Sequence, residues 1–385
     1  MQGLKHDQNQ LLFLSVQLIF TSKRFSKTQR TSHMSITQTQ FKSGIDLSPK
    51  SKAIWKAAQA GVWLVGAFIL TCLLFFPPVG LILFWNILIP VAPALFVLAV
   101  GVWRNVCPLA TTNLLPRHFG FSQKKKLTAI QLGKLNLIAV VALFALVPLR
   151  HAIFNNSGPA TGLLIITMAM IGVGMGFVYE WKSAWCSGLC PIHPVEKLYG
   201  GNVVGSVPNA HCIECQNCVI PCPDSTPNVH PISSKKTIYH QLAGLMVVGG
   251  LPGFIWGWFH VPDETTITSL NNFFSVYELP LIGFVASSII YIIASMMVPN
   301  KYEQKLVSVF AASGVSCYYW YRIPSLIGYG KFADDGLLYN LSGLIPAWVI
   351  PIVNVATTLF FFYFLVIRKT NNQSWVVRPP FATKS

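Results

Sequence analysis

Residues 58–77, AQAGVWLVGAFILTCLLFFP, contain no charged side chain. A helix needs about 20 mainly apolar residues to cross roughly 30 Å of hydrocarbon, so this stretch predicts a transmembrane helix. The whole chain is similarly apolar, with 53% hydrophobic and 10% charged residues and a mean hydropathy of +0.53. An average soluble domain is roughly 25% charged. The composition therefore predicts that the chain is embedded in a lipid bilayer.

Further apolar segments of spanning length follow the first one. They are residues 79–103, 133–153, 160–179, 240–259, 280–299, 306–329 and 340–367. The segment 306–329 is the most polar, because Arg322 follows a run of aromatic residues at 318–321. We interpret that run as an interfacial belt from which the guanidinium extends outward to water. The predicted fold class is an all-α integral membrane bundle of about eight transmembrane helices.

The charges occur in short blocks between the apolar runs. The chain has 28 Lys and Arg against 12 Asp and Glu, a formal charge of +16. A nucleic-acid-binding protein would gather such a surplus on one solvated face, so no nucleic-acid partner is expected. If the N-terminus lies inside, eight spans put on the inner side all basic residues except Arg150, Arg322 and Lys331. The bias predicts a bacterial inner (plasma) membrane protein with both termini in the cytoplasm.

The spans divide the chain into five parts. Residues 1–57 form a basic N-terminal segment, in which Leu11–Phe20 is too short to span and Met34 is interpreted as the physiological start. Residues 58–179 hold the first four spans, and residues 238–367 hold the last four. Between them, residues 180–237 form a cytoplasmic region rich in cysteine, and residues 368–385 form a cytoplasmic tail.

Two segments form a degenerate repeat. The second span runs into Trp103–Leu109, WRNVCPL, and the fourth runs into Cys186–Ile192, CSGLCPI. Each copy ends in Cys-Pro followed by an apolar residue, and the alignment puts Cys186 where the first copy has Trp103. Internal duplication is common in membrane proteins.

The sequence HCIECQNCVIPCP, residues 211–223, carries the most specific motif of the chain. Its four cysteines, Cys212, Cys215, Cys218 and Cys222, have the spacing C-x2-C-x2-C-x3-C-P. The first three thiolates on such a loop can reach three irons of one 4Fe-4S cluster, and the fourth commonly ligates a second cluster. The motif predicts a small ferredoxin-like iron–sulfur insertion on the cytoplasmic side.

Zinc and disulfides explain this spacing less well. Structural zinc usually takes two separated pairs of ligands that close a tetrahedron, and disulfides are rare on the reducing cytoplasmic side. Haem b would need two histidines at matching depth in neighbouring helices. His151 and His260 both fall at predicted outer helix ends. The sequence therefore favours iron–sulfur over haem b, while the same two histidines are also compatible with a quinone pocket.

The complete ligand set stays open at this point. The simplest pairing gives one cluster Cys212, Cys215, Cys218 and Cys190. A second site would then combine Cys222, Cys186 and Cys107, which leaves it one ligand short. It would hold a three-iron cluster, take His193 or His211 as a further ligand, or be absent. The alternative is a single cluster with Cys222 as its own fourth ligand.

These motifs resemble those of the membrane polyferredoxins of the periplasmic nitrate reductase and nitrous-oxide reductase systems. The resemblance rests on Trp185–Pro191, WCSGLCP, and on Cys212–Pro223, and it covers the first five spans. Relatives usually carry two complete ferredoxin runs and two C-x3-C-P motifs. This chain has one run, one C-x3-C-P and the reduced Cys107-Pro108, which puts the second cluster in doubt.

The resemblance implies electron transfer between the quinone pool or a soluble cytoplasmic donor and a partner redox protein. No P-loop, dinucleotide fingerprint or nucleophile motif is found, which argues against independent catalysis. An alternative is an assembly factor that uses its cluster in the reductive maturation of another metalloenzyme. Four lysines near the cysteines would steer an acidic donor or merely follow the topology bias: Lys182, Lys197, Lys235 and Lys236.

Overall fold

The computed structural model describes residues 47–179, 182–211, 224, 237–263, 270–332, 335–369 and 374–377. The chain divides into two compact units, residues 1–42 and 43–385, and every described residue belongs to the second unit. The predicted N-terminal segment up to residue 46 lies outside the described residues. So do four cysteines of the predicted iron–sulfur motif: Cys212, Cys215, Cys218 and Cys222.

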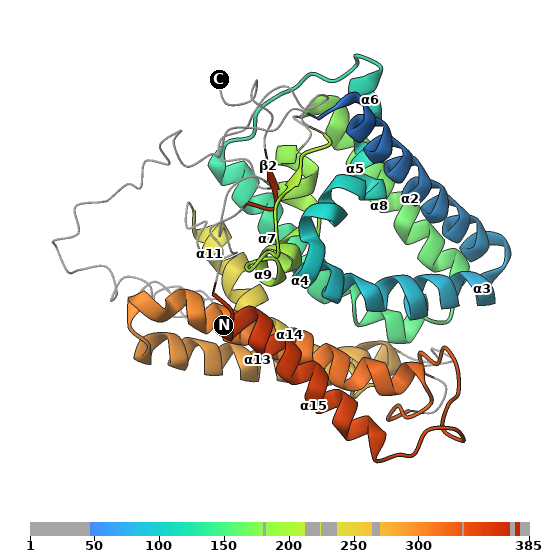
Figure 1. The fold of residues 1–385 in the computed structure, drawn as a ribbon, viewed down its shortest axis with the longest axis vertical. Helices are drawn as coiled ribbons and strands as arrows, with labels where there is room; N and C mark the ends of the chain where they lie inside the picture. Colours follow the sequence, from blue (N-terminus) through green and yellow to red (C-terminus); the bar gives the residue numbers. More distant parts are fainter. Residues whose placement is uncertain are drawn as a thin grey trace, which may run out of the picture. The chain divides into compact units, whose positions relative to one another are not determined.

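The described part is built of helices and one short strand pair (Figure 1). Its α-helices are α2 (Pro49–Phe75), α3 (Pro77–Leu81), α4 (Ile89–Val106), α5 (Pro108–Asn113), α6 (Leu115–His118), α7 (Ala129–Leu146), α8 (Gly158–Val178), α9 (His193–Tyr199), α11 (Ile238–Leu245), α12 (Leu251–Trp258), α13 (Leu270–Met297), α14 (Glu303–Leu326) and α15 (Val349–Phe362). Its π-helical segments are η2 (Ile82–Leu88), η3 (Arg150–Phe154), η4 (Lys182–Leu189), η5 (Met246–Gly250) and η7 (Tyr363–Ile367). A 3-10 turn, η6 (Asn300–Tyr302), precedes α14.

Local sequence explains where several of these helices begin. The Ser48 hydroxyl accepts a hydrogen bond from the Ser51 amide at 3.1 Å, and Pro49 supplies the first residue of α2. The first residue of a helix has no intrahelical partner for its N–H, so proline is favoured there. Thr128 and Gln131 form a capping box at the start of α7. Such caps satisfy backbone N–H groups that a helix leaves unpaired.

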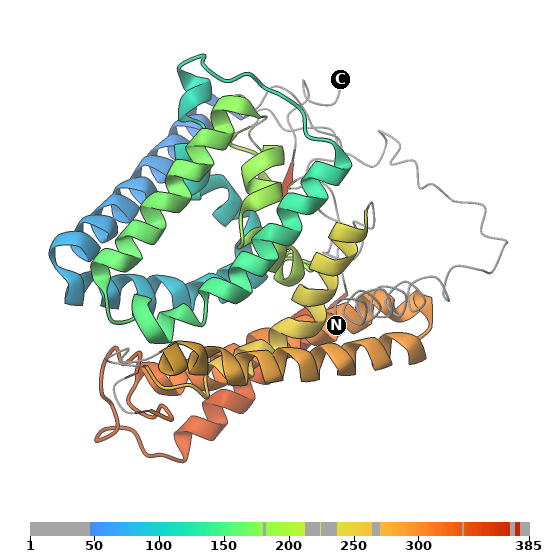
Figure 2. The ribbon, with the colours of Figure 1, turned by 180° about the vertical axis from the view of Figure 1, so that it is seen from behind.

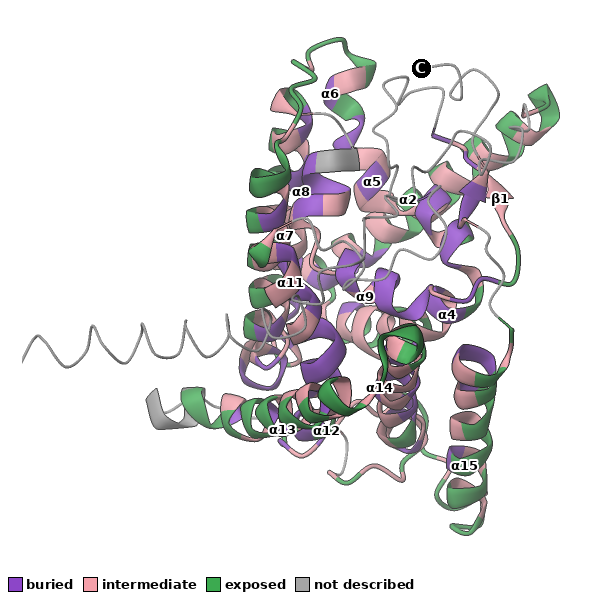
Figure 3. Cartoon of the chain, turned by 90° about the vertical axis from the view of Figure 1, so that its left-hand side faces the viewer, coloured by how far each residue is buried: buried purple, intermediate pink, exposed green. Residues whose placement is uncertain are grey.

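Seven helical stretches of the described part are long and apolar enough to cross a membrane. They are Pro49–Phe75, Pro77–Asn113, Ala129–Leu146, Gly158–Val178, Ile238–Trp258, Phe274–Met297 and Val349–Ile367. Large apolar side chains remain exposed along them, most visibly on α13 and α15 (Figure 3). An apolar exterior is expected where lipid rather than water is the solvent. The predicted all-α membrane bundle is confirmed at this level.

The eighth predicted span differs from the other seven. Residues 306–329 were predicted to span, and they largely coincide with α14, but α14 is not among the seven apolar stretches. The interfacial interpretation of Arg322 is wrong. Its side chain is buried, and its Nη2 donates to the Trp85 carbonyl at 2.6 Å and to Asn86 Oδ1 at 2.9 Å. Internal acceptors stabilise the guanidinium, so it has no need to reach water.

The helices pack in neighbouring pairs. Helix α13 packs against α12 (Figure 3), and α14 packs against α15 (Figure 1). Figure 2 shows α7 beside α11. Glycines permit the closest approach, because a Cβ atom added at Gly253 of α12 would lie 1.9 Å from the Gly283 carbonyl oxygen of α13. Small residues at helix contacts are characteristic of membrane bundles, where van der Waals packing drives association.

One hydrophobic cluster joins the two halves of the chain. It contains Val97 of α4, Val140 of α7, Val247 of η5 and Val315 of α14, all with essentially no exposed surface. These residues come from both sides of the predicted cytoplasmic region in sequence. Helices on both sides of the cysteine motif therefore share one core.

The only strands of the described part form a parallel pair, β1 (Val207–Pro208) with β2 (Val376–Val377). The predicted C-terminal tail thus contributes a strand. Trp375 Nε1 donates to the Gly200 carbonyl at 2.8 Å. A Cβ atom added at Gly101 of α4 would lie 2.3 Å from the Trp375 carbonyl oxygen, so only glycine admits the tail there. The tail therefore lies directly against α4.

Candidate functional site

The chain turns at Cys107 where α4 ends. The Cys107 amide donates to the Trp103 carbonyl at 2.9 Å, and Pro108 begins α5. Proline is suited to this first helical position because it has no N–H to satisfy. The Cys-Pro pair therefore acts as a corner between two helices and holds the Cys107 backbone in a defined position.

The second Cys-Pro corner has one residue more. Here the Cys190 amide donates to the Trp185 carbonyl at 2.8 Å, at the end of the π-helical segment η4. A π turn spans five residues rather than four, so it inserts one residue into the helical pattern. The hydrogen bonds therefore match Trp185 with Trp103, and one of the residues 186–189 is the insertion. The alignment that put Cys186 opposite Trp103 missed this insertion.

Three of the predicted ligands lie together. Cys186 is buried in a cluster with Ala110, Leu114 and Trp185, and Cys107 and Cys190 pack against the same cluster. We call the end of the molecule that holds these three thiols the cysteine end. The pairing predicted from sequence assigned Cys190 to one cluster and Cys107 and Cys186 to a second site, and the structure brings all three into one neighbourhood. The described residues contain no group of three His, Cys, Asp or Glu side chains placed to hold a metal ion.

The Cys190 thiol has an apolar environment. Burial, reinforced by the nearby Glu196 carboxylate, raises the pKa of this thiol above its ordinary value. A buried thiol with a raised pKa is unreactive by itself. A bound metal reverses this situation, because it holds a coordinating thiol as the thiolate. The site is thus poorly suited to a cysteine nucleophile.

A buried ion triad lies beside the thiols. Arg104 Nη1 is 3.0 Å from Glu196 Oε2, and its Nη2 is 2.8 Å from Asp224 Oδ1. The exposed fractions of these three residues are 6%, 2% and 0%. Buried charges are tolerated only when they are paired and hydrogen-bonded. Arg104 lies three residues before Cys107, and Asp224 follows the Cys212–Cys222 motif by two residues.

Glu196 is the centre of a wider hydrogen-bond network. Trp103 Nε1 donates to Glu196 Oε1 at 2.7 Å, and His193 Nδ1 lies 3.2 Å from Glu196 Oε2. Burial opposes ionisation, but Arg104 and the bonds from His193 and Trp103 outweigh it and lower the pKa of Glu196. Burial, reinforced by Arg104 and partly opposed by Glu196, lowers the pKa of His193 to about 4.

The neutral His193 ring has the tautomer that metal ligation requires. With Nδ1–H donated to a carboxylate, the lone pair is on Nε2, as in the carboxylate–histidine pairs that support metal sites. His193 therefore remains a candidate non-cysteine ligand. Lys197, another predicted functional residue, is buried and lies 4.0 Å above the Trp375 ring. It does not present its charge on the surface for steering a partner.

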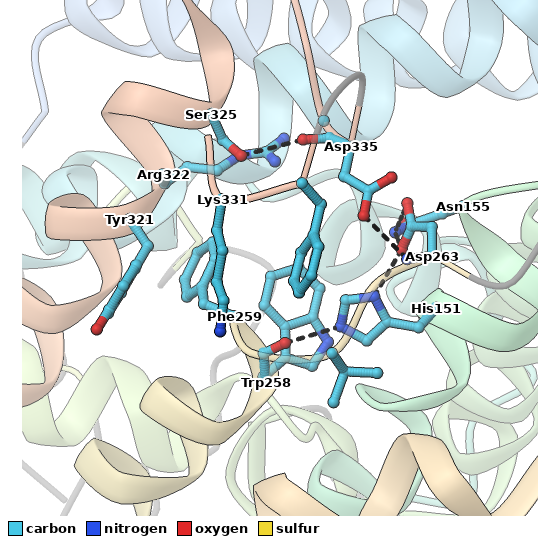
Figure 4. A pocket seen from close by; sticks show the side chains of 13 residues that line it. His151, Asn155, Trp258, Phe259, Asp263, Tyr321, Arg322, Ser325, Lys331 and Asp335 are labelled. Carbon is cyan, nitrogen blue, oxygen red and sulfur yellow. Dashed lines mark hydrogen bonds and ion pairs between the residues drawn. The ribbon is translucent and has the colours of Figure 1, made fainter. Parts of the chain in front are cut away.

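The opposite end of α7 and α8 carries a polar pocket. We call it the pocket end; Figure 4 shows it lined by His151, Asp263, Arg322 and Asp335 among others. His151 Nδ1 is 2.6 Å from Asp263 Oδ1, and Nε2 is 3.0 Å from the Trp258 carbonyl. Both ring nitrogens of His151 therefore face hydrogen-bond acceptors. The cavity measures about 40 Å³.

This geometry bears on the alternative that His151 and His260 hold haem b. His151 has both ring nitrogens engaged, and His260 Nδ1 bonds to the Trp256 carbonyl at 2.7 Å. His151 therefore offers no lone pair to haem iron.

The two ends lie at different levels of α8. The pocket residue Asn155 precedes the first residue of α8, Gly158, whereas Met168 and Met175 pack against the cysteine cluster. At about 1.5 Å per residue, these contacts lie roughly 15–26 Å along the helix from Gly158. The cysteine end and the pocket end therefore have no direct contact, and each needs its own explanation.

The ion triad has little signature in the sequence. Arg104 had the appearance of an ordinary positive charge at the end of a span, and Glu196 and Asp224 lie outside every cysteine motif. One signal was available: residues 180–237 hold 4 of the 12 acidic residues of the chain, Glu196 and Asp224 among them. Searches of family models, curated proteins and solved structures find no match to this chain.

Proposed function

We propose that this chain is a membrane-anchored iron–sulfur protein that relays electrons to or from a partner redox protein, of the membrane polyferredoxin type. The observation that carries the proposal is the arrangement of the cysteine end. Cys107, Cys186 and Cys190 gather in one apolar cluster. His211 and Asp224, which border the Cys212–Cys222 motif, are both buried, and Asp224 is ion-paired to Arg104 beside that cluster.

The residues that would hold a 4Fe-4S cluster are Cys212, Cys215 and Cys218, with Cys190 or Cys222 as the fourth ligand. A second site would use Cys186 and Cys107, with His193 as a candidate non-cysteine ligand. Soft thiolates in apolar surroundings are the ligands that iron–sulfur clusters require. A bound cluster would supply one-electron transfer. The raised pKa of the Cys190 thiol fits this role, because free Cys190 would be inert.

The protein's own residues would tune such a site. The apolar packing of Trp185, Ala110 and Leu114 excludes water, and the buried Arg104 guanidinium places a fixed positive charge nearby. Burial, charge and hydrogen bonds to sulfur are what set the potential of an iron–sulfur site. In the proposed topology, α14 is an eighth membrane span, and both termini and the cysteine end lie on the cytoplasmic side.

Electron entry belongs at the cysteine end in this proposal. The pocket end lies near the start of α8, away from the cysteine cluster, and its lining holds no sulfur. A quinol or a soluble cytoplasmic donor would therefore react beside Cys107 and Cys190.

The test is anaerobic purification in detergent, with iron and acid-labile sulfide counted per chain and EPR spectra recorded after dithionite reduction. About four irons and four sulfides would support one cluster, and seven or eight irons would support a second. Multiple-turnover reduction of an artificial acceptor would support a relay. Zinc without sulfide in protein kept from air would overturn the proposal.

A further inference from the structure

We infer that the last turn of α4 is a two-point clamp, formed by Arg104 and Asn105, which fixes both ends of the Cys212–Cys222 motif next to Cys107. The existence of the clamp rests on described contacts alone. Its consequence, that cluster retention depends on Arg104 and Asn105, rests on the proposed function. These two residues are thereby assigned a positioning role.

Asn105 fixes the chain that enters the motif. Its Oδ1 accepts from the Ala210 amide at 3.2 Å, and its Nδ2 donates to the Pro208 carbonyl at 2.8 Å. The Asn105 side chain thus provides hydrogen-bond partners for two backbone groups of the entering chain. Asn105 is 1% exposed. The next residue, His211, donates its amide to Asn209 Oδ1 at 2.9 Å. The entering chain is therefore held up to the residue before Cys212.

Arg104 fixes the chain that leaves the motif. Its Nε donates to Asp224 Oδ1 at 2.9 Å, while Nη1 donates to Glu196 Oε2 at 3.0 Å. The planar guanidinium holds both carboxylates at defined angles, which a lysine ammonium does not do. Asp224 is completely buried, and its carbonyl accepts from the Val376 amide at 3.1 Å.

The strand pair connects the two points of the clamp. The Val207 amide donates to the Trp375 carbonyl, and the Asn209 amide donates to the Val377 carbonyl. The tail therefore bonds to the entering chain through β1 and to the leaving chain through Asp224. Arg104 and Asn105 are adjacent in α4, and Cys107 caps the same helix. The chain segments on both sides of the motif are therefore bonded to the same helical turn.

The first experiment measures the clamp without reference to iron. Hydrogen–deuterium exchange would be followed in peptides covering 207–211 and 374–377, in wild type, Arg104→Met and Asn105→Ala. Both variants should speed exchange in both peptides, because the two points share the strand pair. The matched control is Arg117→Met, since no ion pair of Arg117 is found among the described residues. Unchanged exchange in both variants would overturn the clamp.

The second experiment measures the consequence. The rate of iron loss to a chelator and the midpoint potential would be compared in wild type, Arg104→Met, Arg104→Lys and Asn105→Ala. Supporting residues around metal ligands typically contribute about 10–100-fold to metal affinity, so Arg104→Met should lose iron roughly tenfold faster. Arg104→Lys should keep the wild-type potential better than Arg104→Met, because it keeps the charge, yet still lose iron faster.

The outcomes separate the two proposals. Wild-type protein without iron, combined with faster exchange in Arg104→Met, would end the proposed function and leave the clamp standing. Iron-loaded wild type whose iron loss and potential are unchanged by Arg104→Met and Asn105→Ala would overturn the positioning role and leave the electron carrier standing. A global folding defect would appear as faster exchange in the α12 and α13 peptides, which the clamp does not touch.

Discussion

The cysteine end and the pocket end both bury charged side chains, but they surround them with different chemistry. At the cysteine end, the Arg104 triad lies beside three thiols in an apolar cluster. At the pocket end, His151 bonds to Asp263 and to the Trp258 carbonyl, and Arg322 bonds to backbone and asparagine oxygens. The pocket lining holds no sulfur. Buried charge is therefore common to both ends, and soft ligands are found at one of them. Under the proposed function, the end that combines the two is where iron would bind.

The largest effect is expected from removing a thiol at the cysteine end. Cys190→Ala should lower bound iron by about half or more, because a cluster without its full ligand set is lost. Cys72→Ala, which removes a buried thiol of α2 far from the motif in sequence, is the control and should keep its iron. Iron and acid-labile sulfide per chain would be measured in both variants and in wild type. Unchanged iron in Cys190→Ala would mean that the Cys212–Cys222 motif supplies all four ligands.

Glu196→Ala should produce the next largest effect, on stability. It removes one partner of the buried Arg104 and leaves the Trp103 and His193 donors without their acceptor. Breaking a buried ion pair in this way costs about 3–5 kcal/mol of unfolding free energy. Unfolding in a denaturing detergent series measures it, with the exposed Glu278→Ala as control. Equal stability of the two variants would show that the triad is not what holds the cysteine end.

A change at the pocket end should be smaller and should leave iron untouched. Asp263→Asn keeps the shape but removes the charge that faces His151, and it should cost about 1–3 kcal/mol. The iron content and midpoint potential should equal those of wild type, because the pocket lining shares no residue with the cysteine cluster. A shifted potential would contradict the independence of the two ends and would indicate coupling through α7 and α8.

The smallest effect is expected from Trp375→Phe in the tail. The phenyl ring keeps the apolar contact with α4 but cannot donate to the Gly200 carbonyl. Loss of one hydrogen bond should cost about 0.5–1.5 kcal/mol. Iron should be retained at the wild-type level, since the β1–β2 backbone bonds remain. A larger loss of iron here than in Arg104→Met would mean that the tail, rather than α4, fixes the motif.

The helix boundaries show where sequence reasoning reached its limit. Hydropathy predicted a first span from 58, whereas α2 begins at Pro49, because the Ser48 cap and basic residues extend the helix beyond its apolar part. The last span was predicted from 340, yet α15 begins at Val349. Hydropathy measures which residues lipid accepts, and helix ends are determined by capping. The π turn before Cys190 was equally invisible, because a one-residue insertion leaves composition unchanged.

The sequence by itself determined that this protein is an apolar helical membrane protein, because each span is a local run of residues that lipid accepts. It also determined the cysteine spacing on which the iron–sulfur proposal depends, since neighbouring ligands are set by the chain. Only the tertiary structure decided that Cys107 lies with Cys186 and Cys190, that Arg104 pairs with Glu196 and Asp224, and that the tail completes the clamp. Those contacts join residues about 80 to 170 positions apart, and their geometry follows from packing of whole helices.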